Sequence, residues 1–118
     1  MKFLKIIEKG DELDKADERL ILELISNSAR ASDLCDEALE AAKQGVFQQS
    51  DILLHQAEEA IAEAHDCQFS LLTKQAQGED VEVNILMVHG QDHLNRATIS
   101  HKFTLELCVV YKKLFKQL

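Results

Sequence analysis

Apolar residues recur along most of this chain at the spacing of amphipathic α-helices. Gly45 follows the first periodic segment and Gly78 follows the second, which is where glycine commonly ends a helix. We predict three helices, over about Asp14–Gln44, about Phe47–Ala76 and from the cap Asn84 to about Lys116. A polar connector at residues 78–83 separates the last two.

Short connections between long helices make sequential neighbours antiparallel. The predicted fold is therefore all-α, an antiparallel up-down-up three-helix bundle over residues 14–118 with an N-terminal extension at residues 1–13. The core face of the first helix comprises Ile21, Leu24, Ser28, Ala31, Cys35, Ala38 and Ala42. That of the second comprises Leu54, Ala57, Ile61, Ala64, Gln68 and Leu71. Ser50 and Asp51 come early enough to support the start of the second helix.

The third predicted helix carries two stripes when successive residues are placed 100° apart. One is a core face of Met87, Leu94, Thr98, His101, Leu105, Cys108 and Val109. The other begins with His89, Asp92, His93, Arg96 and Ser100 and turns apolar at Phe103, Leu107, Val110, Tyr111 and Leu114. A surface helix of a monomeric bundle needs only one apolar face, so the second stripe predicts self-association. Periodicity does not define the number of subunits.

Composition excludes several classes of function. The chain has 118 residues, no proline and a net charge of -8, so it repels nucleic acid and anionic membrane surfaces. No apolar run is long enough to insert into and cross a bilayer. The cysteines, Cys35, Cys67 and Cys108, form no metal-binding pairs and fall at or near positions predicted to be buried. Free core thiols favour a cytoplasmic location.

The most distinctive feature is the group His89, Asp92 and His93, whose i, i+3, i+4 spacing places three polar side chains on one helix face. It could be a solvated face or a fortuitous metal-binding pair of histidines. A neutral imidazole is also a good nucleophile toward phosphorus. The chain has no glycine-rich phosphate loop and no Ser/His/Asp set, so a phosphohistidine carrier fits better than a hydrolase.

Asp92 and the remaining histidines have competing explanations. If several subunits brought copies of Asp92 together, their repulsion would favour a shared Mg²⁺ ion with oxygen ligands. The alternative is an ion pair with Arg96, four residues further along the same face. We expect His65 to be a hydrogen-bonded structural residue near the inner face, and His55 and His101 to lie at the surface or its boundary.

The run Val88-His89-Gly90-Gln91-Asp92-His93-Leu94 resembles the signature of the lactose/cellobiose (chitobiose) family of enzyme IIA proteins, components of the bacterial sugar phosphotransferase system. The similarity extends over about Leu20–Leu114. Its supporting segments are Glu37–Gly45, Ala62–His65 with Gln68, and Ala76–Gly78. It implies a phosphotransferase component that assembles as a homotrimer of three-helix subunits.

The resemblance also implies roles for single residues. His89 matches the histidine that carries the phosphoryl group, and Gln91 and His93 flank it as further catalytic residues. Asp92 matches the aspartate that meets its symmetry copies around one shared Mg²⁺ ion per trimer. The phosphoryl group would come from the histidine-containing phosphocarrier protein. It would pass to a cysteine of enzyme IIB during uptake of a β-linked disaccharide of the cellobiose, lactose or chitobiose class.

The chain departs from the family pattern at two places. Asn95 and Arg96 stand where Met and Thr are usual, and residues 29–33 exchange the charges of a Gly-acid-Ala-Arg-Ser run. These departures bear on partner docking. The alternative function is a non-catalytic regulatory relative that acts by protein–protein binding. A third class is a plain helical assembly protein, in which the polar triplet would be accidental.

Overall fold

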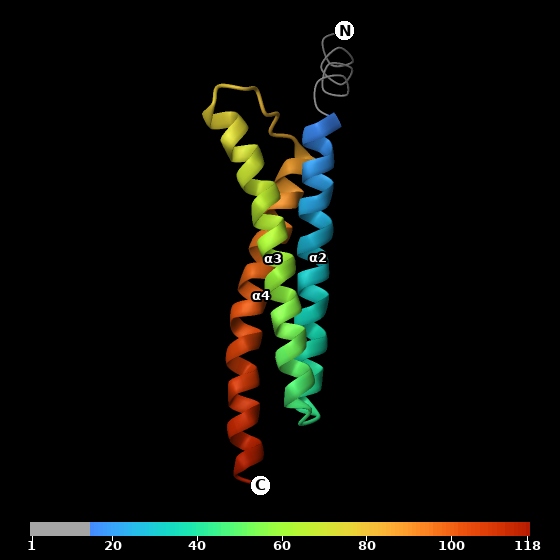
Figure 1. The fold of residues 1–118 in the computed structure, drawn as a ribbon, viewed down its shortest axis with the longest axis vertical. Coiled ribbons are helices and arrows are strands. Elements are labelled where there is room, and N and C mark those ends of the chain that lie inside the picture. The colour runs from blue at the N-terminus through green and yellow to red at the C-terminus, as the bar shows by residue number, and fades with distance from the viewer. Residues whose placement is uncertain (1–14) are drawn as a thin grey trace.

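The computed structural model describes residues 15–118, so the predicted extension at residues 1–13 lies outside the described residues. The described chain consists of α2 (Lys15–Lys43), α3 (Phe47–Ala76) and α4 (Ile85–Lys116) and contains no strand. The three helices run antiparallel in turn, and α2 packs against both others more extensively than these pack against each other (Figure 1). The predicted all-α bundle is confirmed, with helix ends within about one residue of those expected.

Glycine ends two helices as predicted. Gly45 has φ 77°, a left-handed conformation that costs other residues energy. Its amide donates to the carbonyl of Ala42 over 3.0 Å, while that of Val46 donates to Ala41 over 2.9 Å. These two bonds satisfy carbonyls that the end of α2 leaves unpaired. Gly78, with φ 85°, ends α3 through the same pattern.

The turn at Gly45 is also covered by the end of α4. A Cβ atom built on Gly45 would lie only 2.5 Å from Cε1 of Phe115. The Phe115 ring packs edge-on against Phe47, with centroids 5.2 Å apart. The C-terminal part of α4 is thereby fixed to the α2–α3 turn, and this contact requires the absence of a side chain at position 45.

The first turns of α3 correct one expectation. Val46 precedes the helix and provides no side-chain cap. Ser50 is fully buried, with its hydroxyl 3.2 Å from the Cys108 thiol, and Asp51 accepts hydrogen bonds from Lys112 of α4. Both side chains therefore join α3 to α4 and do not cap the helix start, because they follow its first three residues and the Ser50 amide is already bonded to the Val46 carbonyl.

The buried positions of α2 are those predicted, together with Asp17. On α4 the prediction was partly wrong, because Thr98, Leu105 and Val109 are exposed. The buried set is Met87, Gly90, Leu94, Ala97, Thr104 and Cys108, and His101 is half-buried. From Met87 to Cys108, with half-buried His101 included, the positions that face the core recur every 3.5 residues on average. The prediction placed successive residues 100° apart, so its core face drifts from the real one by about 20° every seven residues. The error therefore accumulates along the helix, as expected for helices that coil gently around each other.

The buried face of α3 includes every predicted apolar residue, whereas Gln68 is only half-buried. All three cysteines are free and buried, as predicted. Burial, together with the nearby charge of Asp36, raises the pKa of the Cys35 thiol to about 11. Burial and the charge of Glu23 also raise the pKa of Cys67. Cysteine here behaves as a small core residue.

The apolar part of the second stripe on α4 is exposed in the single chain. Phe103, Leu107, Val110 and Leu114 retain 61%, 43%, 50% and 50% of their accessible surface. Tyr111 does not belong with them, because it is half-buried against the core around Ala38 and Leu54. Among residues 15–118, no helix combines the length and apolarity that a bilayer crossing requires.

Candidate functional site

The first half of α4 carries the predicted site. Asn84 caps this helix as expected, because its side-chain oxygen accepts a hydrogen bond from the Met87 amide over 2.9 Å. Gly90 brings α4 close to α2: a Cβ atom there would lie 3.1 Å from Cδ2 of Leu24. The cap at Asn84 fixes the start of α4, and the contact at Gly90 fixes its distance from α2. The candidate site lies on this part of α4.

His89 and His93 lie side by side, as their spacing predicted. Their Nε2 atoms are 3.0 Å apart, and their rings are nearly perpendicular with centroids 4.4 Å apart. At this distance one ring donates its Nε2–H and the other accepts with the Nε2 lone pair. His89 is exposed and His93 half-buried, so the nitrogen pair lies within reach of another protein.

Asp92 lies on the same stripe and forms the ion pair considered as an alternative. One of its carboxylate oxygens is 3.7 Å from Nη1 of Arg96, and both side chains are more than half exposed. An exposed pair at this distance contributes little free energy, about 0.2–1 kcal/mol. Within the described part of one chain, no three His, Cys, Asp or Glu side chains lie close enough to hold a metal ion. On this stripe, one subunit thus offers a metal ion a single carboxylate, that of Asp92.

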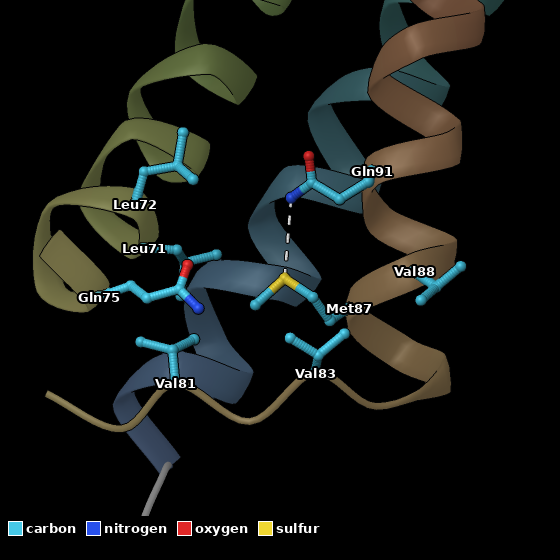
Figure 2. A pocket seen from close by; sticks show the side chains of 8 residues that line it. All are labelled: Leu71, Leu72, Gln75, Val81, Val83, Met87, Val88 and Gln91. Atoms are coloured by element: carbon cyan, nitrogen blue, oxygen red, sulfur yellow. Dashed lines mark hydrogen bonds between the residues drawn. The ribbon is translucent and has the colours of Figure 1, made fainter.

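The structure does not bring Gln91 together with the histidine pair. Two residues along a helix correspond to a rotation of about 200°, so Gln91 faces away from His89. Its half-buried side chain reaches toward α3, where Nε2 of Gln68 donates to its Oε1 over 2.5 Å. Its own Nε2 points to the Met87 sulfur, 3.7 Å away (Figure 2).

An apolar hollow of about 270 Å³ lies beside Gln91. Figure 2 shows that its walls come from the end of α3, the connector and the start of α4. The lining residues are Leu71, Leu72, Gln75, Val81, Val83, Met87, Val88 and Gln91. Gln91 is the polar group at the α4 wall of this hollow.

A second, more polar hollow of about 340 Å³ also borders Gln91. It is lined by His65, Gln68, Gln91, Leu94, Asn95 and Thr98. His65 places its Nδ1 3.4 Å from Oε1 of Gln68, so it is hydrogen-bonded as predicted, although its side chain lies at the surface. Sequence reasoning placed Gln68 in the core and missed its bond to Gln91. The available signal was an amide at a helix position that otherwise faces apolar residues.

His55 and His101 take no part in this arrangement. His55 is exposed and lies 3.1 Å from a carboxylate oxygen of Glu59, one turn along α3. His101 is half-buried at the edge of the α4 core face. Both agree with the expected surface or boundary positions.

Comparison with known proteins identifies relatives of one kind. The family profile described as "PTS system, Lactose/Cellobiose specific IIA subunit" matches residues 19–112. The lactose-specific EIIA component of the PTS system of Staphylococcus epidermidis is 38% identical over 91 residues, which cover 77% of this chain and 88% of that protein.

Two solved structures have the same fold. The cellobiose-specific enzyme IIA of Bacillus anthracis superposes with a TM-score of 0.86 at 36% identity, over 92% of this chain and 99% of that one. The IIA component in the IIA(Chitobiose)–HPr complex of the Escherichia coli phosphotransferase system superposes with a TM-score of 0.69 at 32% identity. That match covers 83% of this chain and 95% of the other.

Proposed function

Since the chain belongs to the lactose/cellobiose-specific IIA family of the sugar phosphotransferase system, we propose that it accepts a phosphoryl group on His89 and passes it on. The donor is the histidine-containing phosphocarrier protein, and the acceptor is a cysteine of enzyme IIB. The transfer serves uptake of a β-linked disaccharide. The observation that carries this proposal is the accessible histidine pair, with 3.0 Å between the Nε2 atoms of His89 and His93.

The pair supports a specific division of roles. When His93 holds its proton on Nε2, the lone pair of His89 is available on the facing Nε2 atom. That lone pair attacks phosphorus, a new N–P bond forms, and the N–P bond to the donor histidine breaks with its electron pair returning to the donor. The His93 N–H then donates to a phosphoryl oxygen and offsets part of its charge.

Transfer from His89 to enzyme IIB proceeds by the same exchange of bonds at phosphorus. A cysteine thiolate of enzyme IIB attacks the phosphorus, and the N–P bond breaks with its electron pair returning to Nε2 of His89. The neutral imidazole is regenerated, and His93 again donates to it. No deep pocket is required, because both reactions take place between two protein surfaces.

We also propose a homotrimer assembled along α4. This proposal is supported by the exposed apolar stripe of α4, because burying each large side chain contributes roughly 1.5–3 kcal/mol. The stripe consists of Phe103, Leu107, Val110 and Leu114. The direction of Gln91 is a second argument. Its amide faces away from His89 of its own chain, so in a catalytic role it would meet the phosphoryl group of a neighbouring subunit.

The residues fit the Mg²⁺ ion that this family implies. Asp92 is exposed and, within the described part of the chain, pairs only with Arg96 at 3.7 Å, so its carboxylate is available to turn toward other copies. Three such carboxylates would supply the hard oxygen ligands that Mg²⁺ prefers, and one chain supplies only one. When bound, the ion would neutralise the repulsion between the three Asp92 side chains.

The net charge of the chain and a solved complex of a relative both support the proposed partners. A chain of net charge -8 suits a phosphocarrier with a basic docking face. The solved complex of a chitobiose IIA with HPr, at 32% identity to this chain, supports a donor of that class. A cytoplasmic location follows from the proposed role.

Incubation with phosphoenolpyruvate, enzyme I and the phosphocarrier protein tests the proposal. We expect one acid-labile phosphate per chain, which leaves the protein when enzyme IIB is added. A regulatory relative that acts only by binding would remain unphosphorylated while the phosphocarrier is labelled. His55→Ala is the matched control, because it removes an exposed imidazole from α3, remote in sequence from the pair.

A further inference from the structure

We infer that Gln68 is a positioning residue that holds the side-chain amide of Gln91 with its carbonyl bound to α3 and its N–H groups directed toward the hollow beside Met87, where they can donate to another acceptor. The inference rests on the proposed function, in which Gln91 meets a phosphoryl group. It goes beyond that function by assigning a role to a residue of α3 that is 23 positions away from Gln91 in sequence. Gln68 itself touches no reacting atom.

The hydrogen bonds determine the orientation of the Gln91 amide. Nε2 of Gln68 donates to Oε1 of Gln91 over 2.5 Å, so the carbonyl side of the amide is taken. Within residues 15–118, the nitrogen side of the amide hydrogen-bonds only to the Met87 sulfur, at 3.7 Å, and a thioether is a weak acceptor. The N–H donors of Gln91 can therefore exchange this contact for a stronger acceptor at small cost.

The orientation matters because a phosphoryl oxygen accepts hydrogen bonds and donates none. The N–H groups of Gln91, which face the hollow, stabilise a phosphoryl oxygen that approaches there, whereas a reversed amide would present carbonyl lone pairs to an anion. Packing alone does not exclude the reversed form, because Gln91 borders a hollow of about 270 Å³ on one side and one of about 340 Å³ on the other. The bond from Gln68 is therefore the feature that selects the productive orientation.

Gln68 is oriented in turn by His65. Nδ1 of His65 lies 3.4 Å from Oε1 of Gln68, so the carbonyl of Gln68 faces the imidazole and its nitrogen faces Gln91. The three side chains line the same polar hollow. The hydrogen bonds run in one direction: His65 donates to Gln68, and Gln68 donates to Gln91. Reversing either amide would break this series.

Replacing Gln68 with Glu tests the inference because a carboxylate can only accept. Gln91 must then turn its nitrogen toward α3 and its oxygen toward the hollow beside Met87. We expect transfer at saturating phosphocarrier to slow by about tenfold or more, with little change in KM, as for loss of one hydrogen bond to a charged group. Gln68→Met removes the bond without reversing the amide and should slow transfer less.

Gln56→Glu is the matched control. It adds the same charge at an exposed position of α3, twelve residues before Gln68, and lines neither of the two hollows that border Gln91. It should transfer phosphate at close to the wild-type rate. The side-chain amide resonances of Gln91, identified by their loss in Gln91→Ala, should move in Gln68→Glu and stay in place in Gln56→Glu.

A double variant separates positioning from general damage to the fold. In the Gln91→Ala background, Gln68→Glu should cause no further loss of rate, since the residue that it positions is absent. Wild-type transfer in Gln68→Glu and Gln68→Met, or an equal loss with and without Gln91, would overturn the inference while leaving the proposed function intact. A wild-type chain that never accepts phosphate would overturn both.

Discussion

Nε2 of His93 lies 3.0 Å from Nε2 of His89, within hydrogen-bond distance of the facing nitrogen. This relationship predicts unequal effects of removing each ring. His89→Ala should abolish phosphorylation, whereas His93→Ala should still accept phosphate at a rate reduced by about tenfold to a hundredfold, as for loss of one donor to the developing charge. Neither change should alter helicity, which circular dichroism checks. Equal rates in wild type and His93→Ala would remove His93 from the mechanism.

The apolar stripe on α4 predicts which surface substitution separates the subunits. Leu107→Asp should dissociate the proposed trimer, because it buries a charge in an apolar contact. Leu105→Asp is the matched control, because Leu105 is equally exposed, at 44% against 43%, but faces about 200° away. Sedimentation at micromolar concentration distinguishes them. A wild type that sediments as a monomer, with or without a divalent cation, would contradict the assembly.

Asp92 should oppose assembly when no cation is present, because like charges in a poorly solvated site repel. Replacing Asp92 with Leu should keep or strengthen the trimer and make it insensitive to a chelator. Wild-type assembly should instead weaken when chelator removes Mg²⁺. Dissociation of the Asp92→Leu protein would show that the carboxylate holds the subunits together by direct contacts.

Replacing Gly45 or Gly78 with alanine allows the cost of a steric clash to be separated from the cost of backbone strain. Both have positive φ, so alanine at either should cost about 1–2 kcal/mol from backbone strain. At Gly45 the new Cβ would also meet Phe115, at 2.5 Å, whereas no atom of residues 15–118 lies within 4 Å of a Cβ at Gly78. Urea unfolding should therefore show the larger loss for Gly45→Ala. In a Phe115→Ala background the two losses should become similar, and a persistent gap would contradict the proposed clash.

Burial of Cys35 predicts a pH dependence. Its pKa in the folded chain is about 11, against 9.0 for an ordinary thiol, so the folded state binds its proton more tightly than the unfolded state does. The resulting stability is present below pH 9 and is lost as pH rises through 11. At pH 8 its thiolate fraction is about a hundredfold lower than that of an ordinary thiol. Iodoacetamide should therefore modify Cys35 in urea but hardly in the native protein.

The sequence allowed accurate prediction of features that depend on local chemistry. Gly45 and Gly78 ended helices because their left-handed backbone is available to glycine, and Asn84 capped α4 because its short side chain reaches the Met87 amide. The pairing of His89 with His93 followed from helical spacing alone.

Features that depend on packing between helices were missed. The core face of α4 drifted to Thr98 and Leu105 because the period of a packed bundle is shorter than that of an isolated helix. The resemblance grouped Gln91 with the histidines as a catalytic residue, but it did not reveal that Gln68 of another helix binds the Gln91 side chain. No pattern within one helix contains that information.

The most direct measurement is the position of the phosphate on the intact protein. After incubation with phosphoenolpyruvate, enzyme I and the phosphocarrier, mass spectrometry of peptides prepared at alkaline pH identifies the modified residue, and ³¹P spectra identify the nitrogen. We predict a single phosphoryl group on Nε2 of His89, which enzyme IIB removes. A phosphate on His93, or an unmodified chain beside a fully labelled phosphocarrier, would contradict the proposed mechanism.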